Sequence, residues 1–167
     1  HPNCFSMWFA GGGMKPGRTL KAVIPGGSSV PIMTAAETED CLLDYEGVVA
    51  RGSMLGSAGM IVMDDSTDMV YQIWRLARFY AHESCAQCTQ CREGTAWTTK
   101  ILERILAGKG KAADLDLLLS LSENMTGKTI CVLSDSCAAP IVSGIAKFRS
   151  EFDAYLSGAR QPALAMA

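Results

Sequence analysis

The sequence predicts an α+β protein in which a small β-sheet precedes a four-helix bundle. Up to about position 65 the chain is rich in Gly, Pro and Ser and contains short apolar runs, a pattern typical of strands joined by turns. Beyond that position apolar side chains recur every three or four residues, which is the period of amphipathic helices. We therefore place a domain boundary near Ser66 and expect three segments: residues 1–65, residues 66–160, and a tail over residues 161–167.

Two strands are predicted in the first segment. Leu20–Ile24 is a short β-like run that leads into the turn sequence PGGSSVP. The run GMIVM at residues 59–63 ends at two aspartates, which indicates a buried strand closed by solvated carboxylates. Together these runs predict a small sheet with long turns.

Four amphipathic helices are predicted in the second segment. The first follows cap candidates at residues 66–68 and leads the chain to Cys85. Glycines end the second and third helices, over residues 95–107 and 113–125. Pro140 opens the fourth, which extends to residue 155, because proline is tolerated in the first turn of a helix. Four helices in so short a stretch imply a bundle.

Composition argues against several classes of protein. The chain has 15 Lys and Arg against 17 Asp and Glu, so it lacks the basic footprint of a nucleic-acid-binding protein. No apolar stretch approaches the roughly 20 residues that span a bilayer, and we expect no direct membrane insertion. Three of the seven cysteines crowd together, and an odd number would leave one thiol unpaired in a disulfide framework. Cysteines that bind a metal in a reducing compartment account better for this number and spacing.

The strongest chemical signal is the segment ESCAQCTQCREG, which places Cys85, Cys88 and Cys91 in a C-x-x-C-x-x-C triplet. On a straight helix, residues three apart drift by about 60° per step, so the three thiols would not share a face. We therefore expect the triplet on a curved loop, where each thiolate can meet a different iron of a cubane cluster. The fourth iron would then take a distant cysteine.

Two cysteines are candidates for that fourth ligand. Cys131 follows the apolar pair Thr129-Ile130 in GKTIC. Cys137 lies beside two alanines at the start of a predicted helix, where a small buried cysteine is natural. We favour Cys131. Cys4 and Cys41 lie outside the helical segment and are interpreted as buried or partly exposed thiols without a metal.

Zinc is the main alternative metal, in a structural interaction domain rather than an electron carrier. Four-cysteine zinc sites usually pair two C-x-x-C motifs, but this chain has only one dense cluster of cysteines. Arg92 and Lys128 lie near candidate ligands, and either could offset the negative charge of a four-thiolate cluster or remain a solvated cation. His82 is interpreted as a helix-end cap.

Four segments, in order, resemble the C-terminal half of the NADH-binding flavoprotein subunit of respiratory complex I, its F subunit. They are LKAVIPGGSSVP, GSMLGSAGMIVMD, ESCAQCTQCREGT and GKTICVLSD, and the likeness runs from about Gly11 to Leu156. Similar segments occur in the diaphorase subunits of NAD-linked hydrogenases and in NAD-linked formate dehydrogenases, which are the alternatives within the family.

This resemblance implies a partial ubiquitin-like β-grasp layer of the soluble-ligand-binding (SLBB) type, followed by a helical domain that holds a [4Fe-4S] cluster. The cysteines that match the family's ligands are Cys85, Cys88, Cys91 and Cys131. The implied role is electron transfer from reduced FMN toward further clusters and quinone in NADH:quinone oxidoreductase. The implied partners are other peripheral-arm subunits, including a small iron-sulfur subunit. The implied location is the cytoplasmic side of the bacterial inner membrane or the mitochondrial matrix side.

The family's FMN and NADH sites lie mainly in a preceding N-terminal domain with its own glycine-rich signature, and nothing in these residues corresponds to it. The opening HPNCFSMWFA also differs from the usual start of the β-grasp layer. We therefore expect a partial product with no catalytic residue of its own, active only as part of an NADH dehydrogenase (quinone) complex and unable to oxidise NADH alone.

Overall fold

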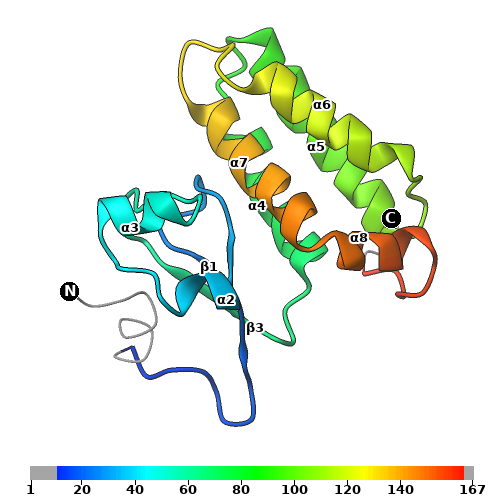
Figure 1. Ribbon diagram of the computed structural model, residues 1–167. Coiled ribbons are helices and arrows are strands. Elements are labelled where there is room, and N and C mark those ends of the chain that lie inside the picture. The colour runs from blue at the N-terminus through cyan, green and yellow to red at the C-terminus, as the bar shows by residue number, and fades with distance from the viewer. Residues whose placement is uncertain (1–10, 164–167) are drawn as a thin grey trace. The chain divides into compact units, whose positions relative to one another are not determined.

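The computed structural model describes residues 11–163, so Cys4 lies outside the described residues. The chain divides between Thr67 and Asp68 into two compact units, which are described separately (Figure 1). The first contains a small antiparallel sheet and the second a helical bundle, which confirms the predicted α+β class. The β-grasp type of the sheet layer stays a prediction. None of the helices within residues 11–163 is long and apolar enough to cross a membrane.

The sheet of the first unit has three antiparallel strands in the order β2-β1-β3. The central strand β1 spans Leu20–Ile24, as predicted, and lies between β2 (Met33–Thr34) and β3 (Ile61–Asp64). In this register Val23 faces Met33 on one side and Val62 on the other. The last three residues of β1 are buried, and neighbouring strands pair with both of its edges.

The prediction that the second strand is buried was wrong. In β3, Ile61 and Val62 are 39% and 38% exposed, and only Met63 is well buried. Among residues 11–163, the strand pairs with β1 alone and lies at the edge of the sheet. An apolar run has the same composition in an edge strand as in a buried one, so the pattern alone could not separate the two.

Two short helices of the first unit were not predicted. Helix α2 (Ala35–Thr38) begins at a capping box in which Thr34 and Glu37 bond reciprocally, and α3 (Tyr45–Ala50) begins at Asp44, whose carboxylate accepts the Gly47 N–H. Helices of four and six residues are too short to show a helical period. They enclose a small core of Met33, Cys41 and Val48, so Cys41 is a buried thiol, as interpreted.

The second unit is a bundle of α4 (Met69–Glu83), α5 (Thr89–Leu106), α6 (Ala113–Met125) and α7 (Leu133–Lys147), followed by the short α8 (Arg149–Leu156). The four long helices alternate in direction, and α4 packs against both α5 and α7 (Figure 1). The end of α4, the start of α5, the end of α6 and the start of α7 therefore share one end of the bundle. Its fully buried side chains include Met69, Ile73, Leu102, Ile105, Leu106, Leu115, Leu118 and Phe152.

Two predicted helix boundaries were wrong. Helix α5 begins at Thr89 instead of residue 95, and Pro140 lies inside α7 rather than at its start. Proline removes one backbone hydrogen bond from a helix. Buried Cys137 and Ile141 on either side of Pro140 hold α7 in the core, so tertiary packing outweighs that loss. The predicted fourth helix is also interrupted at Phe148, where the backbone leaves the helical conformation before α8 begins.

Thr98, on α5, should be a site where a substitution stabilises the bundle. Its side chain is fully buried, and its hydroxyl has no hydrogen-bond partner among the described residues. Burying a polar group without a partner is unfavourable, so Thr98→Val should raise the free energy of unfolding by about 1 kcal/mol in urea titration. Thr95→Val is the matched control, because the Thr95 hydroxyl donates to the Cys91 carbonyl at 2.7 Å, and it should bring no gain. An unchanged or lower value for Thr98→Val would contradict the expectation.

A second prediction concerns the ion pair between α5 and α6. Both carboxylate oxygens of Asp114 accept hydrogen bonds from Arg104, and the Lys111 N–H adds a third at 2.9 Å. Burial raises the pKa of Asp114, but the Arg104 guanidinium and these hydrogen bonds outweigh burial, so the pKa lies below its ordinary value. The pair therefore stabilises the fold above the unfolded-state pKa of about 3.9, and this contribution is lost as the pH falls through the lower, folded-state pKa.

Asp114→Asn should accordingly lower the free energy of unfolding at pH 7 by about 1 to 3 kcal/mol. It should also flatten the loss of stability below pH 4, as measured by urea titration at several pH values. Asp153→Asn is the control, because its i,i+4 pair with Arg149 is solvent-exposed and exposed pairs contribute about 0 to 1 kcal/mol. Equal effects of the two substitutions would show that the pair formed by buried Asp114 stabilises the fold no more than an exposed pair does.

Candidate metal centre

The four predicted ligand cysteines lie in three segments at one end of the bundle. Cys85 is in the loop after α4, Cys88 is the N-cap residue of α5, and Cys91 is in the first turn of that helix. Cys131 lies in the connection between α6 and α7, just before α7 begins. The prediction that the whole triplet sits on a loop was therefore only partly right. Cys88 and Cys91 both belong to the start of α5. Side chains in a helix tilt toward its N-terminus, so the Cys91 side chain is directed toward this end of the helix.

A hydrogen bond joins the distant cysteine's loop to the triplet. The backbone N–H of Ile130 donates to the Cys88 sulfur at 3.4 Å, across 42 positions of sequence. Cys85 and Cys131 are exposed, Cys88 is partly buried and Cys91 is buried. The cysteines of both loops thus lie at one end of the bundle. Cys91 faces the core, whereas Cys85 and Cys131 face solvent.

The candidate donors are all cysteine thiols, and thiolates are the ligands that iron-sulfur clusters take. Three of them come from the segment around the start of α5 and one from the connection before α7. Each iron of a cubane takes its own thiolate, so four cysteines supply the number of ligands that a [4Fe-4S] cluster needs.

Hydrogen bonds hold the Cys85 loop in one conformation. Arg92 donates from Nη1 to the Ala86 carbonyl at 2.7 Å and from Nε to Glu93 at 2.9 Å. Ala86 has a positive φ of 63°, an uncommon conformation for a residue with a side chain, and its N–H donates to the Ser84 hydroxyl. The sequence left the role of Arg92 open, and the structure places its guanidinium on the cysteine loop. Lys128 instead contacts Asn124 at the surface.

A second network holds the Cys131 loop. The Thr129 hydroxyl donates to the Cys131 carbonyl at 2.8 Å and lies 2.6 Å from the hydroxyl of fully buried Ser134. Asp135 accepts the N–H of Gly127, which has a positive φ of 68°. Sequence reasoning missed these residues. The available signal was the pair of short polar side chains at Ser134 and Asp135 in the first turn of a helix.

The starts of α5 and α7 create a favourable environment for thiolates. The N-cap residues Cys88 and Val132 form no side-chain capping hydrogen bond. First-turn N–H groups at such ends lack an intrahelical acceptor, and the positive end of the helix dipole favours negative charge nearby. A negatively charged cluster at this end of the bundle would therefore be stabilised by the two helix starts.

Cys137 lies in a contrasting environment. It is fully buried in α7, and burial, together with nearby Cys91, raises its pKa to about 12. Cys131 is exposed instead and belongs to the loop whose Ile130 N–H donates to the Cys88 sulfur. This contact supports the choice of Cys131. His82 lies in the last turn of α4, where a helix-end cap was expected.

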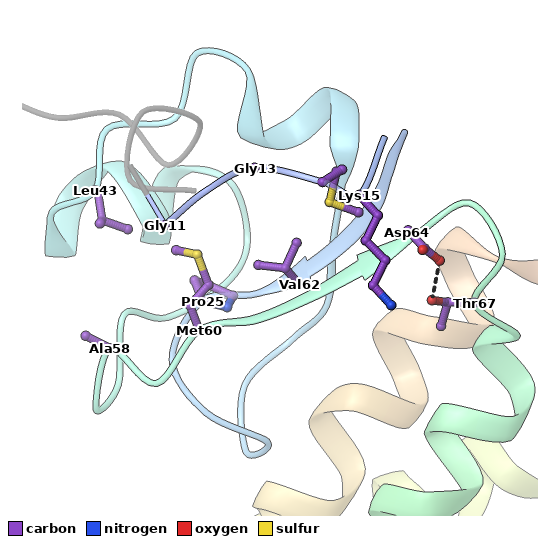
Figure 2. Close-up of a pocket in the computed structure, with 11 residues that line it drawn as sticks. Gly11, Gly13, Lys15, Pro25, Leu43, Ala58, Met60, Val62, Asp64 and Thr67 are labelled. Carbon is purple, nitrogen blue, oxygen red and sulfur yellow. Dashed lines mark hydrogen bonds between the residues drawn. The ribbon is translucent and has the colours of Figure 1, made fainter. Parts of the chain in front are cut away.

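The first unit contains a separate hollow of about 550 Å³ on the side of β3 (Figure 2). Its walls are mainly apolar, and Lys15 and Asp64 are its charged members. Asp64 already accepts hydrogen bonds from Ser66 and Thr67, and the Ser66 hydroxyl bond holds the pKa of this carboxyl below its ordinary value. The carboxylate thus orders the turn after β3.

Comparison with known proteins agrees with this geometry. Residues 71–155, just over half of the chain, match the family model described as the NADH-ubiquinone oxidoreductase-F iron-sulfur binding region. The chain belongs to this family. The matched range includes all four candidate ligands and the helices that position them.

Relatives of this family extend the likeness into the sheet unit. The chain is 48% identical over 143 residues to an F subunit of NADH-quinone oxidoreductase from Rhizobium meliloti (strain 1021), which covers 85% of this chain and 33% of that protein. It is also 48% identical over 147 residues to the corresponding F subunit from Streptomyces coelicolor, covering 88% of this chain and 32% of that protein. The chain thus spans about a third of the length of these curated relatives. The predicted resemblance to the C-terminal part of the F subunit is confirmed.

A solved structure shows the same fold in a related enzyme. The crystal structure of an NAD⁺-reducing [NiFe]-hydrogenase in the H₂-reduced state superposes with a TM-score of 0.74 and 33% identity. The likeness covers 83% of this chain and 23% of the hydrogenase chain.

Proposed function

We propose that this chain holds a [4Fe-4S] cluster through Cys85, Cys88, Cys91 and Cys131 and serves as an electron carrier. The observation that carries the proposal is the bond from the Ile130 N–H to the Cys88 sulfur, because it unites the triplet with the loop of the fourth cysteine. The family match over residues 71–155 supports the same ligand set.

The protein's own residues would act by binding the cluster and controlling access to it. When bound, the cluster supplies one-electron transfer. Buried Cys91 anchors one side against the core, while exposed Cys85 and Cys131 leave the other side open to a donor or acceptor. The two helix starts would offset part of the negative charge of four thiolates.

In the complete system, we propose that electrons arrive from reduced FMN and leave toward further clusters and quinone, within NADH:quinone oxidoreductase. FMN and NADH would bind in the preceding domain of a full-length subunit. The partners would be other peripheral-arm subunits, including a small iron-sulfur subunit, on the cytoplasmic side of the bacterial inner membrane or on the matrix side in mitochondria. The identities of 46 to 48% to F subunits of bacterial NADH-quinone oxidoreductases support this role.

A diaphorase role in an NAD-linked hydrogenase is the second candidate, favoured by the likeness to the NAD⁺-reducing hydrogenase. The cluster would have the same ligands in either system and would differ only in its final acceptor. A structural zinc domain is the rival of a different class. Metal analysis of the anaerobically purified chain separates the two classes directly: about four irons with sulfide and a brown colour, or a single zinc without colour.

The ligand set predicts a specific pattern among cysteine variants of the full chain. Cys88→Ser should abolish the cluster and reduce helicity, because the loop it anchors has few apolar side chains to order it without metal. Cys131→Ser should lose the cluster or leave a three-iron form. Cys137→Ser and Cys41→Ser are matched controls that should keep full iron and sulfide content. The measurements are iron and acid-labile sulfide analysis, circular dichroism and electron paramagnetic resonance. Cluster loss in Cys137→Ser with retention in Cys131→Ser would reassign the fourth ligand.

The location of the flavin site gives another prediction. The chain alone should bind neither FMN nor NADH with useful affinity, and should not reduce an artificial acceptor with NADH. Hydride chemistry requires flavin and nicotinamide to be positioned in a preformed pocket with polar contacts to phosphate and ring. Flavin fluorescence quenching measures FMN binding directly, and tight binding by this chain would show that the flavin site lies within it.

A further inference from the structure

The sulfur of Cys91 has a neighbour that the proposed ligand set does not include. The Ser84 hydroxyl oxygen lies 3.3 Å from this sulfur, within hydrogen-bond distance for a sulfur acceptor. Ser84 follows the last residue of α4 with an extended backbone, whereas Cys91 is in the first turn of α5. The contact therefore joins the two helices that flank the cysteine loop.

The surroundings determine which atom is the donor. Ser84 already accepts the Ala86 N–H at 3.3 Å through its oxygen, and its single hydroxyl proton remains for another acceptor. A cysteine bound to iron is a thiolate and has no proton to give. In the cluster-bound protein the hydroxyl must therefore donate to the Cys91 sulfur.

The burial of the contact strengthens this hydrogen bond. Cys91 is only 7% exposed, and Ser84 is partly buried at the base of the loop. Hydrogen bonds to charged groups are stronger than neutral ones, and a surrounding of low dielectric constant strengthens them further. Hydrogen bonds to ligand sulfurs are one of the means by which proteins set the potential of an iron-sulfur cluster.

We propose that Ser84 is a positioning residue that raises the reduction potential of the cluster by donating its hydroxyl hydrogen bond to Cys91. This inference rests on the proposed cluster. One electron from reduced flavin, or from a chemical reductant such as dithionite, adds one negative charge to the site. Ser84 keeps its proton throughout, and its bond to the sulfur strengthens as the charge on the sulfur grows. The reduced state therefore gains more from Ser84 than the oxidised state does.

Ser84 also has a structural role, because it accepts the Ala86 N–H at the base of the loop. Two substitutions separate the roles. Ser84→Ala removes the hydroxyl, whereas Ser84→Thr keeps it, and a β-branched side chain is compatible with the extended backbone at this position. Ser136→Ala is the matched control, since its exposed hydroxyl, near Cys131 in sequence, donates to the Val132 carbonyl and not to a sulfur.

The test is a dithionite titration of the anaerobic full chain, followed by electron paramagnetic resonance, after iron and sulfide analysis of each variant. Ser84→Ala should keep its cluster but shift the reduction equilibrium about tenfold toward the oxidised form. This shift corresponds to a reduction potential about 59 mV more negative for a one-electron couple. Ser84→Thr and Ser136→Ala should stay near the parent potential. Electron-nuclear double resonance should show an exchangeable proton coupling that disappears in D₂O and in Ser84→Ala.

The outcomes separate this inference from the proposed function. If the parent chain contains no cluster, the proposed function itself fails. If Ser84→Ala retains full iron and sulfide with an unchanged potential, the cluster assignment stands and the role of Ser84 is refuted. A Ser136→Ala shift as large as that of Ser84→Ala would also refute it, because loss of any nearby hydroxyl would then suffice. If Ser84→Ala loses its cluster, the reduction potential of Ser84→Thr decides. A potential that differs from that of the parent chain refutes the proposal. A potential equal to that of the parent chain, together with the exchangeable proton coupling, supports it.

Discussion

The antiparallel packing of four helices is the constraint on which the candidate metal centre depends. Short connections force successive helices to reverse direction, so the end of α4 and the starts of α5 and α7 meet at one end of the bundle. The two cysteine-bearing loops, far apart in sequence, thereby come into contact. The hydrophobic core therefore indirectly sets the spacing of the sulfurs, and changes in helix packing would act on the site.

The packing brings the loops together, but polar contacts determine their shape. Arg92 and Ser84 hold the Cys85 loop, while Thr129, Ser134 and Asp135 hold the Cys131 loop. Most of these contacts end on backbone groups, which would otherwise be unsatisfied in segments without regular secondary structure. These polar contacts and the proposed cluster would therefore act together on the shape of the two loops.

Burial distinguishes Cys137 from the candidate ligand Cys131. Cys88, Cys91 and Cys131 lie at or next to helix starts, at the end of the bundle where the two cysteine loops meet. Cys137 is only a few residues further along α7, yet it is fully buried, and burial raises its pKa. A difference of less than two helical turns therefore changes the surroundings of the same side chain.

Local patterns in the sequence determined the type of most elements, and tertiary structure decided the rest. The period of apolar residues predicted α4 and α6, the β-like run predicted β1, and the cysteine spacing indicated a metal site, because backbone geometry relates short spacings directly to structure. The edge position of β3, the continuation of α7 through Pro140 and the contact of Ser84 with Cys91 depend instead on which segments pack side by side. The bond from Ile130 to Cys88 joins residues 42 positions apart. No local pattern records such a contact, because burial and long-range hydrogen bonds are properties of the packed chain and not of any one of its segments.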